Sequence, residues 1–148
     1  MNILVTGGAG YIGSVTAESL IQAGHSVTVY DSLVTGHRAA APDGVNFVEA
    51  DLADSHTLVE TFIKNKFDAV MHFAAFIEAG ESMKDPGRFY QNNFTNAITL
   101  AETAVRAGVK RFVLSSTAAV FQSSEEPLNE ESPLGPTNVY GHTKLMVE

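Results

Sequence analysis

The feature that most constrains the fold is a glycine-rich loop directly after the first apolar segment of the chain. Residues 2–6 are a branched, apolar run typical of a buried strand, and residues 11–23 have the pattern of a helix. Gly7 and Gly10 lie between them and Gly13 lies in the first turn of the helix, so the three glycines are each three residues apart. A strand, a glycine turn and a helix in this order predict the first unit of a parallel α/β sheet, with a phosphate site at the helix N-terminus.

Each glycine of this loop has its own physical reason. Gly7 permits the tight turn, Gly10 lets a pyrophosphate approach the backbone, and Gly13 lets the helix pack closely on the strand. The helix N-terminus supplies free N–H groups and a partial positive charge. The alternative is a glycine-rich turn without a ligand, which the positions of the flanking strand and helix disfavour.

The rest of the chain alternates strands and helices. Further strands are expected at residues 27–30, 45–49, 68–73 and 110–115. Helices are expected from Asp54 to about residue 65, from Pro86 to Gly108, and from Thr137 or Asn138 to Glu148, with a loop at residues 122–136. This alternation predicts an α/β fold with a doubly wound parallel sheet, the Rossmann fold, in one domain spanning residues 1–148.

An acidic residue at the end of the second predicted strand identifies the nucleotide. The carboxylate of Asp31 can accept hydrogen bonds from both hydroxyls of an adenosine ribose, and its charge would repel a 2′-phosphate. The sequence therefore predicts NAD rather than NADP as the cofactor. Arg38 is the one nearby residue that could soften this exclusion.

Asp51 and Leu52 follow the third predicted strand. An acid and an apolar residue at this place can flank an adenine ring, with the acid accepting from the exocyclic amine. A turn that caps the next helix explains the same residues equally well. Both interpretations stay open at this point.

Tyr140 and Lys144 are four residues apart in the last predicted helix and so lie on one face of it. A nearby ammonium favours the phenolate, so Tyr140 could exchange a proton with a substrate hydroxyl at neutral pH. A hydroxyl cluster, Ser115-Ser116-Thr117, ends the fifth predicted strand, where open α/β sheets bind their ligands. The alternatives are a solvated helix face, and hydroxyls that satisfy backbone groups at the strand end.

Composition excludes several classes of partner. The net charge of -8 disfavours nucleic acid and anionic membranes, and no apolar run approaches the ~18 residues of a membrane span. The sequence has no cysteine, which removes disulfides, thiolate nucleophiles and zinc–thiolate sites. We expect no metal site and a cytoplasmic protein.

Taken in order, five segments resemble the extended short-chain dehydrogenase/reductase family. They are VTGGAGYIGS at the glycine loop, HFAAFIEAGES at residues 72–82, FYQNN at 89–93, RFVLSSTAAVF at 111–121 and YGHTKLMVE at 140–148. The chain is most similar to the family's 4-epimerases, which interconvert UDP-glucose and UDP-galactose through transient hydride transfer at sugar C4. The resemblance implies that Tyr140 is the acid–base residue, that Thr117 bridges the sugar and Tyr140, and that Lys144 holds the nicotinamide ribose.

The resemblance also implies a set of cofactor contacts and partners. The expected NAD-binding residues are Gly7, Gly10, Tyr11, Ile12, Gly13, Asp31, Ser32, Asp51, Leu52, Phe73, Ala74, Ala75, Asn92, Ser115, Tyr140 and Lys144. A UDP-sugar is the expected substrate and a homodimer the expected assembly of the full-length protein.

The sequence departs from the family pattern in ways that leave alternatives open. Ala118-Ala119 stand where 4,6-dehydratases carry an acid–base pair, and a decarboxylase would need a carboxylate there, so both are disfavoured. Ile77 replaces a lysine that contacts the cofactor in some epimerases, and Val120-Phe121-Gln122 replaces the usual Val-Tyr-Gly. An epimerase of another nucleotide-sugar, a non-catalytic NAD-binding module and a dimerisation scaffold remain alternatives.

Family members are about twice as long as this chain, and their substrate domain follows the segment that matches here. We therefore expect the chain to lack the C-terminal substrate domain, to end inside its last helix, to bind NAD weakly by itself and not to epimerise alone. Conversion of UDP-galactose to UDP-glucose by the purified chain would refute this expectation.

Overall fold

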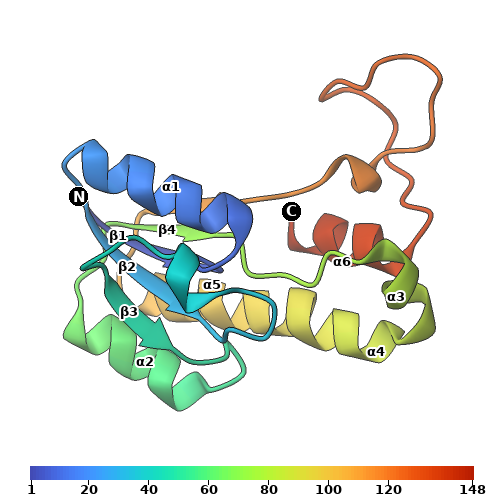
Figure 1. Cartoon of the computed structure of the whole chain (residues 1–148). Coiled ribbons are helices and arrows are strands. Elements are labelled where there is room, and N and C mark those ends of the chain that lie inside the picture. The colour runs from blue at the N-terminus through green and yellow to red at the C-terminus, as the bar shows by residue number, and fades with distance from the viewer. The chain divides into compact units, whose positions relative to one another are not determined.

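The computed structural model describes all 148 residues (Figure 1). They form two compact units. The sheet unit comprises residues Met1–Ala74 and Thr99–Ser115, and the helical unit comprises Ala75–Ile98 and Ser116–Glu148. The assignment of the whole chain to one domain stays a prediction.

The sheet unit contains five parallel strands in the order β3-β2-β1-β4-β5. The strands are β1 (Asn2–Thr6), β2 (Ser26–Asp31), β3 (Asn46–Glu49), β4 (Ala69–His72) and β5 (Arg111–Leu114). The predicted doubly wound fold is confirmed. Because all strands run in one direction, the segments that follow them meet at one edge of the sheet.

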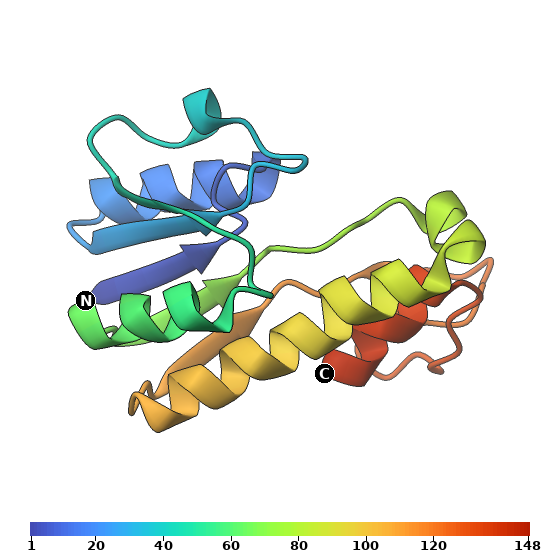
Figure 2. The same ribbon diagram turned by 90° about the horizontal axis from the view of Figure 1, so that it is seen from below.

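Helices cover both faces of this sheet (Figures 1 and 2). One face, with Ile3 and Val5, packs against Ala17 of α1 (Tyr11–Gln22). Leu4 points to the other face, in a cluster with residues of α2 (Ser55–Lys64) and α5 (Asn96–Arg106). Side chains alternate across a strand, so β1 supplies apolar residues to both cores.

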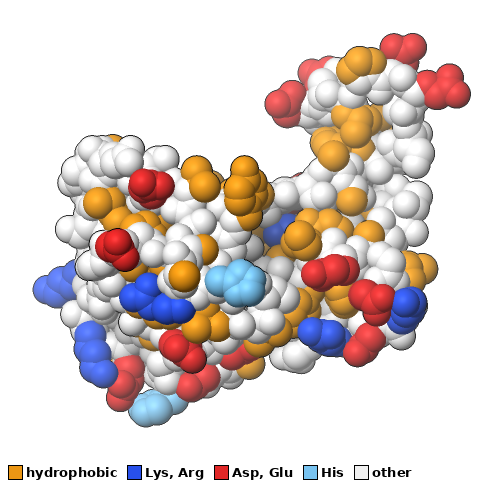
Figure 3. All heavy atoms as spheres, viewed as in Figure 1, with side chains coloured by type: hydrophobic (Ala, Val, Ile, Leu, Met, Phe, Trp, Pro, Cys, Tyr) orange, Lys and Arg blue, Asp and Glu red, His pale blue; other side chains and the backbone are white.

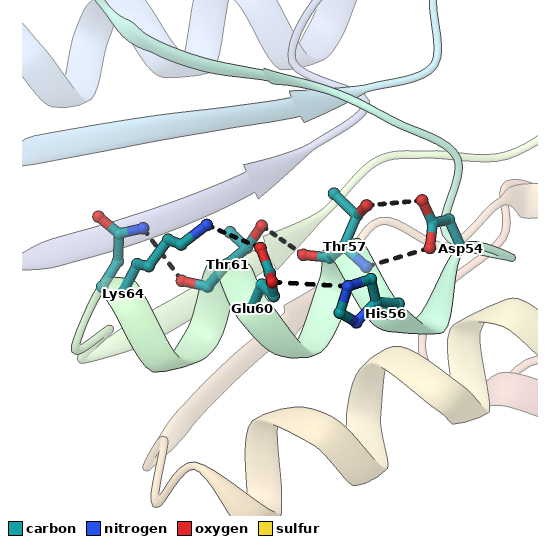
Figure 4. A network of polar contacts seen from close by, with 7 residues as sticks. Asp54, His56, Thr57, Glu60, Thr61 and Lys64 are labelled. Carbon is teal, nitrogen blue, oxygen red and sulfur yellow. Dashed lines mark hydrogen bonds and ion pairs between the residues drawn. The ribbon is translucent and has the colours of Figure 1, made fainter.

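Helix α2 is fixed at its start by Asp54, which accepts hydrogen bonds from the Thr57 backbone N–H at 3.0 Å and its hydroxyl at 2.6 Å. Glu60 pairs with His56 and Lys64 one turn away on either side (Figure 4). This cluster of charges stabilises a helix, and no group of acidic, histidine or cysteine side chains in the structure could hold a metal ion.

The helical unit contains α3 (Ala79–Lys84), α4 (Pro86–Phe89), the π-helical segment η2 (Tyr90–Thr95) and α6 (Val139–Val147). Asp85 caps α4 through its side chain, and Asn138, one of the two residues expected to begin the last helix, caps α6 in the same way. Two short 3-10 turns complete the secondary structure, η1 (Arg38–Ala40) in the sheet unit and η3 (Ala118–Val120) in the helical unit.

The sequence predicts one regular helix from Pro86 to Gly108, and the structure differs by placing η2 in its middle. The structure also contains helix α3, which the sequence does not predict. The residue at its N-cap is Glu78, which is not one of the residue types that favour this position and makes no capping bond, and the helix is only six residues long.

Residues 122–136 form the predicted loop. An antiparallel bridge connects Phe121, just before the loop, with Leu134 near its end. Its side chains are mostly exposed, and acidic groups gather on it (Figure 3). None of the helices has both the length and the hydropathy that crossing a membrane requires.

Candidate functional site

The glycine loop of the sheet unit has no room for side chains at Gly7, Gly8 or Gly13, and Gly7 and Gly13 are held closely by backbone atoms. Gly7 has φ +74°, and a Cβ there would lie 2.5 Å from the backbone nitrogen of Ala74. A Cβ on Gly13 would overlap the carbonyl oxygen of Gly7. The loop is therefore closed on itself and on the end of β4, and only glycine satisfies both contacts.

Helix α1 begins directly after this loop without a side-chain cap at Gly10. The side chains of Tyr11 and Ile12 are exposed, at 86% and 58%. The first-turn N–H groups of α1 are therefore not capped by a side chain, which is the arrangement that binds the phosphates of a dinucleotide.

Asp31 lies at the end of β2, buried to 9% exposure. One carboxylate oxygen accepts from the Ala9 N–H of the glycine loop, and the other accepts from the Leu33 N–H, each at 2.9 Å. The second bond holds Leu33 in a left-handed conformation, with φ 58°. Asp31 thus fixes both the glycine loop and the turn that follows β2, where the half-buried Ser32 lies.

Arg38 lies in η1, and its guanidinium carbon lies 4.3 Å above the ring centroid of Phe47 on β3. This geometry is that of a cation–π contact. A softening of the NADP exclusion by Arg38 stays a prediction.

In the turn after β3, Asp51 makes the hydrogen bonds of a turn that leads into α2. Asp51 is exposed, and its Oδ1 accepts from the Ala53 N–H at 2.8 Å, while its carbonyl accepts from the Asp54 N–H at 3.0 Å. Leu52 is buried to 7% in the core cluster. The hydrogen bond from Ala53 uses only one of the two carboxylate oxygens of Asp51. Contact of Asp51 and Leu52 with an adenine ring stays a prediction.

The ends of β4 and β5 complete this edge of the sheet unit. The Phe73 N–H donates to the Thr6 carbonyl at 2.9 Å, and Ala74 lies against Gly7. The Ser115 N–H donates to the His72 carbonyl at 3.1 Å. The sheet unit therefore brings together the predicted cofactor residues of all five strand ends, from Gly7 through Asp31, Asp51 and Phe73 to Ser115.

The helical unit holds the remaining predicted residues: Ala75, Asn92, Thr117, Tyr140 and Lys144. Tyr140 and Lys144 both lie on α6, with Tyr140 half-buried and Lys144 buried. Gly141 lets α6 approach η3, because a Cβ there would overlap the Ala119 carbonyl oxygen. Thr117 caps η3 by accepting from the Ala119 N–H at 3.2 Å, so its hydroxyl already satisfies one backbone group.

Two buried polar residues that the sequence analysis did not single out fix the position of α6. Ser82 accepts from the Tyr140 N–H at 3.0 Å. Asn93 donates to the Thr143 hydroxyl at 3.2 Å and exchanges two 2.9 Å hydrogen bonds with the Phe76 backbone. Asn92 donates to Asn93 at 2.8 Å. Ser82 lies in the segment HFAAFIEAGES and Asn93 in the segment FYQNN, both of which carry the family resemblance. Their place in these segments is the sequence signal that could have identified them.

Burial lowers the pKa of the Lys144 ammonium, and the nearby Glu148 carboxylate opposes this in part. The residue is 4% exposed. A buried ammonium with a lowered pKa costs folding free energy at neutral pH, and such groups are kept at functional sites.

We therefore expect Lys144→Met to raise the free energy of unfolding at pH 7 by about 1 kcal/mol. The variant should unfold at a higher urea concentration than the unchanged chain. Because the lowered pKa means that the unfolded state binds more protons, the stability of the unchanged chain should rise as pH approaches 10, relative to Lys144→Met. Urea unfolding at both pH values measures this, with the exposed Lys110→Met as control. Identical pH profiles for all three proteins would contradict the burial of the charge.

Comparison with known proteins gives a family. The model of the NAD dependent epimerase/dehydratase family matches residues 3–148. The chain belongs to this family. NAD is the cofactor of the family, which agrees with the cofactor that Asp31 predicts.

Individual proteins that are similar to this chain include several 4-epimerases. The UDP-glucose 4-epimerase of Lacticaseibacillus casei is 46% identical over 149 residues, covering 100% of this chain and 45% of that protein. The structure of UDP-glucose 4-epimerase from Brucella ovis in complex with NAD has a TM-score of 0.94 at 41% identity, covering 99% of this chain and 45% of that one. A UDP-Glc/GlcNAc 4-epimerase from Campylobacter jejuni has a TM-score of 0.93 at 43% identity, covering 99% and 46%. The chain thus spans about half the length of the relatives that it matches.

Proposed function

We propose that this chain carries the NAD site and the acid–base residues of a UDP-glucose/UDP-galactose 4-epimerase. The observation that carries the proposal is the pair Tyr140 and Lys144 on one face of α6, in a chain that matches such epimerases over its whole length. The glycine loop fits NAD, because it has no room for a Cβ at Gly7 or Gly13 and leads into an uncapped helix.

The roles follow from the chemistry of each side chain. Tyr140 accepts the proton of the sugar 4-hydroxyl and later returns it, and the Lys144 cation favours the phenolate that this requires. Thr117 bridges the sugar oxygen and Tyr140 through its hydroxyl. NAD held by the glycine loop would supply a reversible hydride acceptor for the sugar C4 carbon. Asp31 accepts from the adenosine ribose, while the first turn of α1 donates N–H groups to the pyrophosphate.

The direct test is incubation with UDP-galactose of the protein isolated at the length at which the cell makes it, and not of the 148-residue chain alone. We expect UDP-glucose to form without net accumulation of NADH, because the hydride returns to the sugar. Net NADH would indicate a dehydrogenase instead, and a 4-keto-6-deoxy sugar would indicate a dehydratase. Either product would overturn the proposal.

The choice of sugar needs a separate arm of this test. One relative is a UDP-Glc/GlcNAc 4-epimerase at 43% identity, so UDP-N-acetylglucosamine is the second candidate substrate. Dehydration is disfavoured because η3 begins with Ala118 and Ala119, and neither side chain can move a proton.

Asp31→Asn is expected to bind NAD about tenfold more weakly and to lose most of its preference for NAD over NADP. The amide keeps one acceptor for the glycine loop but loses the charge that repels a 2′-phosphate. Titration calorimetry with both dinucleotides measures the two affinities. Asp43→Asn, an exposed acid elsewhere in the same unit, is the control. An unchanged NAD/NADP ratio in Asp31→Asn would show that another residue selects the cofactor.

We also propose a cytoplasmic homodimer. The resemblance to the extended short-chain dehydrogenase/reductase family supports this proposal, because it implies a dimer for the full-length protein. Sedimentation of the natively isolated protein at twice the monomer mass would support the dimer, and a monomer would refute it.

A further inference from the structure

Tyr30 connects three segments of the sheet unit that the proposed function assigns to the cofactor. It is the residue before Asp31 on β2. Its carbonyl accepts from the Gly7 N–H at 2.9 Å, and its phenol hydroxyl donates to the Asp51 carbonyl at 3.1 Å. The glycine loop, the ribose acid and the Asp51 turn are thus all tied to this residue.

The phenol ring is rigidly placed. Tyr30 is 1% exposed and belongs to the core cluster that includes Leu52 and Leu58. Burial raises the pKa of the phenol, and the carboxylates of Asp54 and Asp51 raise it further. The hydroxyl therefore remains a hydrogen-bond donor throughout the physiological pH range.

The Tyr30 hydroxyl donates to a carbonyl oxygen that also accepts a hydrogen bond from within the Asp51 turn. The Asp51 carbonyl receives Tyr30 and the Asp54 N–H, and Oδ1 receives the Ala53 N–H. The bonds from Ala53 and Asp54 shape the turn internally. The bond from Tyr30 joins the turn to β2, and the Ala50 N–H adds a 3.1 Å bond to the Asp31 carbonyl.

We propose that Tyr30 is a positioning residue that presents the Asp51 carboxylate to the exocyclic amine of the adenine ring. The inference rests on the proposed NAD site, in which Asp51 reads the adenine. Tyr30 itself is buried behind the turn and acts through Asp51.

The test compares ligands that differ at the adenine amine and at the adjacent ring nitrogen N1, which is protonated in hypoxanthine. Hypoxanthine carries a carbonyl oxygen in place of the amine, so a carboxylate should prefer AMP to IMP, and NAD to nicotinamide hypoxanthine dinucleotide. We expect Tyr30→Phe to weaken AMP binding about fivefold and to lower the preference for AMP over IMP by a similar factor. Binding of nicotinamide mononucleotide, which lacks the adenine, should not change.

Two controls separate positioning from a general loss of structure. Tyr90→Phe, in the helical unit, removes a phenol hydroxyl elsewhere and should leave both affinities unchanged. In an Asp51→Asn background Tyr30→Phe should have little further effect, since the two residues act on the same contact. Tyr30→Leu, which also lacks the hydroxyl, repeats the measurement if the Phe variant does not fold.

The outcomes distinguish this inference from the proposed site. A Tyr30→Phe chain that keeps the full preference for AMP would overturn the inference alone. Equal losses of AMP, IMP and nicotinamide mononucleotide binding would also overturn it, because the effect would then be structural. An unchanged chain that binds AMP and IMP equally would overturn the role of Asp51 and this inference with it.

Discussion

Replacing Tyr140 with phenylalanine is expected to lower kcat of the natively isolated protein for UDP-galactose by a factor of about 10²–10⁴. The phenol oxygen is the group that exchanges the proton of the sugar 4-hydroxyl in the proposed mechanism, and phenylalanine keeps the ring but removes that oxygen. The backbone N–H that bonds Ser82 is unchanged, so α6 should stay in place. Steady-state rates and NAD titrations on the same samples measure the two effects.

NAD affinity separates the catalytic role of Tyr140 from a purely binding role. We expect the Tyr140→Phe protein to bind NAD within about threefold of the unchanged protein, a difference of less than 1 kcal/mol. Turnover that survives in this variant would mean that another group moves the proton. Equal loss of turnover and of NAD binding would mean that Tyr140 serves the cofactor and not the chemistry.

Replacing Gly7 with alanine is expected to cost about 3 kcal/mol or more of folding free energy and to abolish NAD binding. The left-handed backbone alone costs an alanine about 1–2 kcal/mol. The added Cβ would also lie 2.5 Å from the Ala74 nitrogen and 2.8 Å from the Phe73 carbonyl carbon, and neither backbone atom can move without disturbing the end of β4. Urea unfolding and NAD titration measure both losses.

Gly24→Ala is the matched control for this substitution. Gly24 has φ +82°, and a Cβ there meets nothing within 4 Å, so only the backbone penalty of about 1–2 kcal/mol applies. The difference between the two variants is the cost of the close approach of the glycine loop to β4. Equal destabilisation of both variants would show that the loop has room for a side chain.

The sheet and its ligand-binding edge could be predicted from the sequence because the signals are local. Branched apolar runs define the strands, and Gly7 and Asp31 follow strands directly, so topology alone places them at one edge. Asp54 was predicted as a helix cap from residue type and Asn138 as one of two candidates, and both make the expected bonds.

The helical unit was less predictable because its geometry depends on tertiary hydrogen bonds. The π-helical segment η2 interrupts a helix whose sequence contains no glycine or proline there, and Asn93 within it bonds the distant Phe76 backbone. Ser82 reaches Tyr140 across 58 residues of sequence. The spacing of apolar residues in the sequence does not predict such long-range hydrogen bonds. Serine and asparagine are also too common for Ser82 or Asn93 to stand out by residue type.

The same limit applies to the second function of Asp31. The sequence identifies it as the acid that selects the nucleotide, but not as the residue that accepts from Ala9 and Leu33. Those bonds fix the glycine loop before any ligand binds, so one carboxylate shapes the site and selects the cofactor.

The most direct test of this account is the identity of the nucleotide in the natively isolated protein, released by denaturation and identified by mass. We predict NAD or NADH, bound close to one per chain. NADP, or a protein that is isolated empty and does not bind added NAD at millimolar concentration, would contradict the assignment of the site.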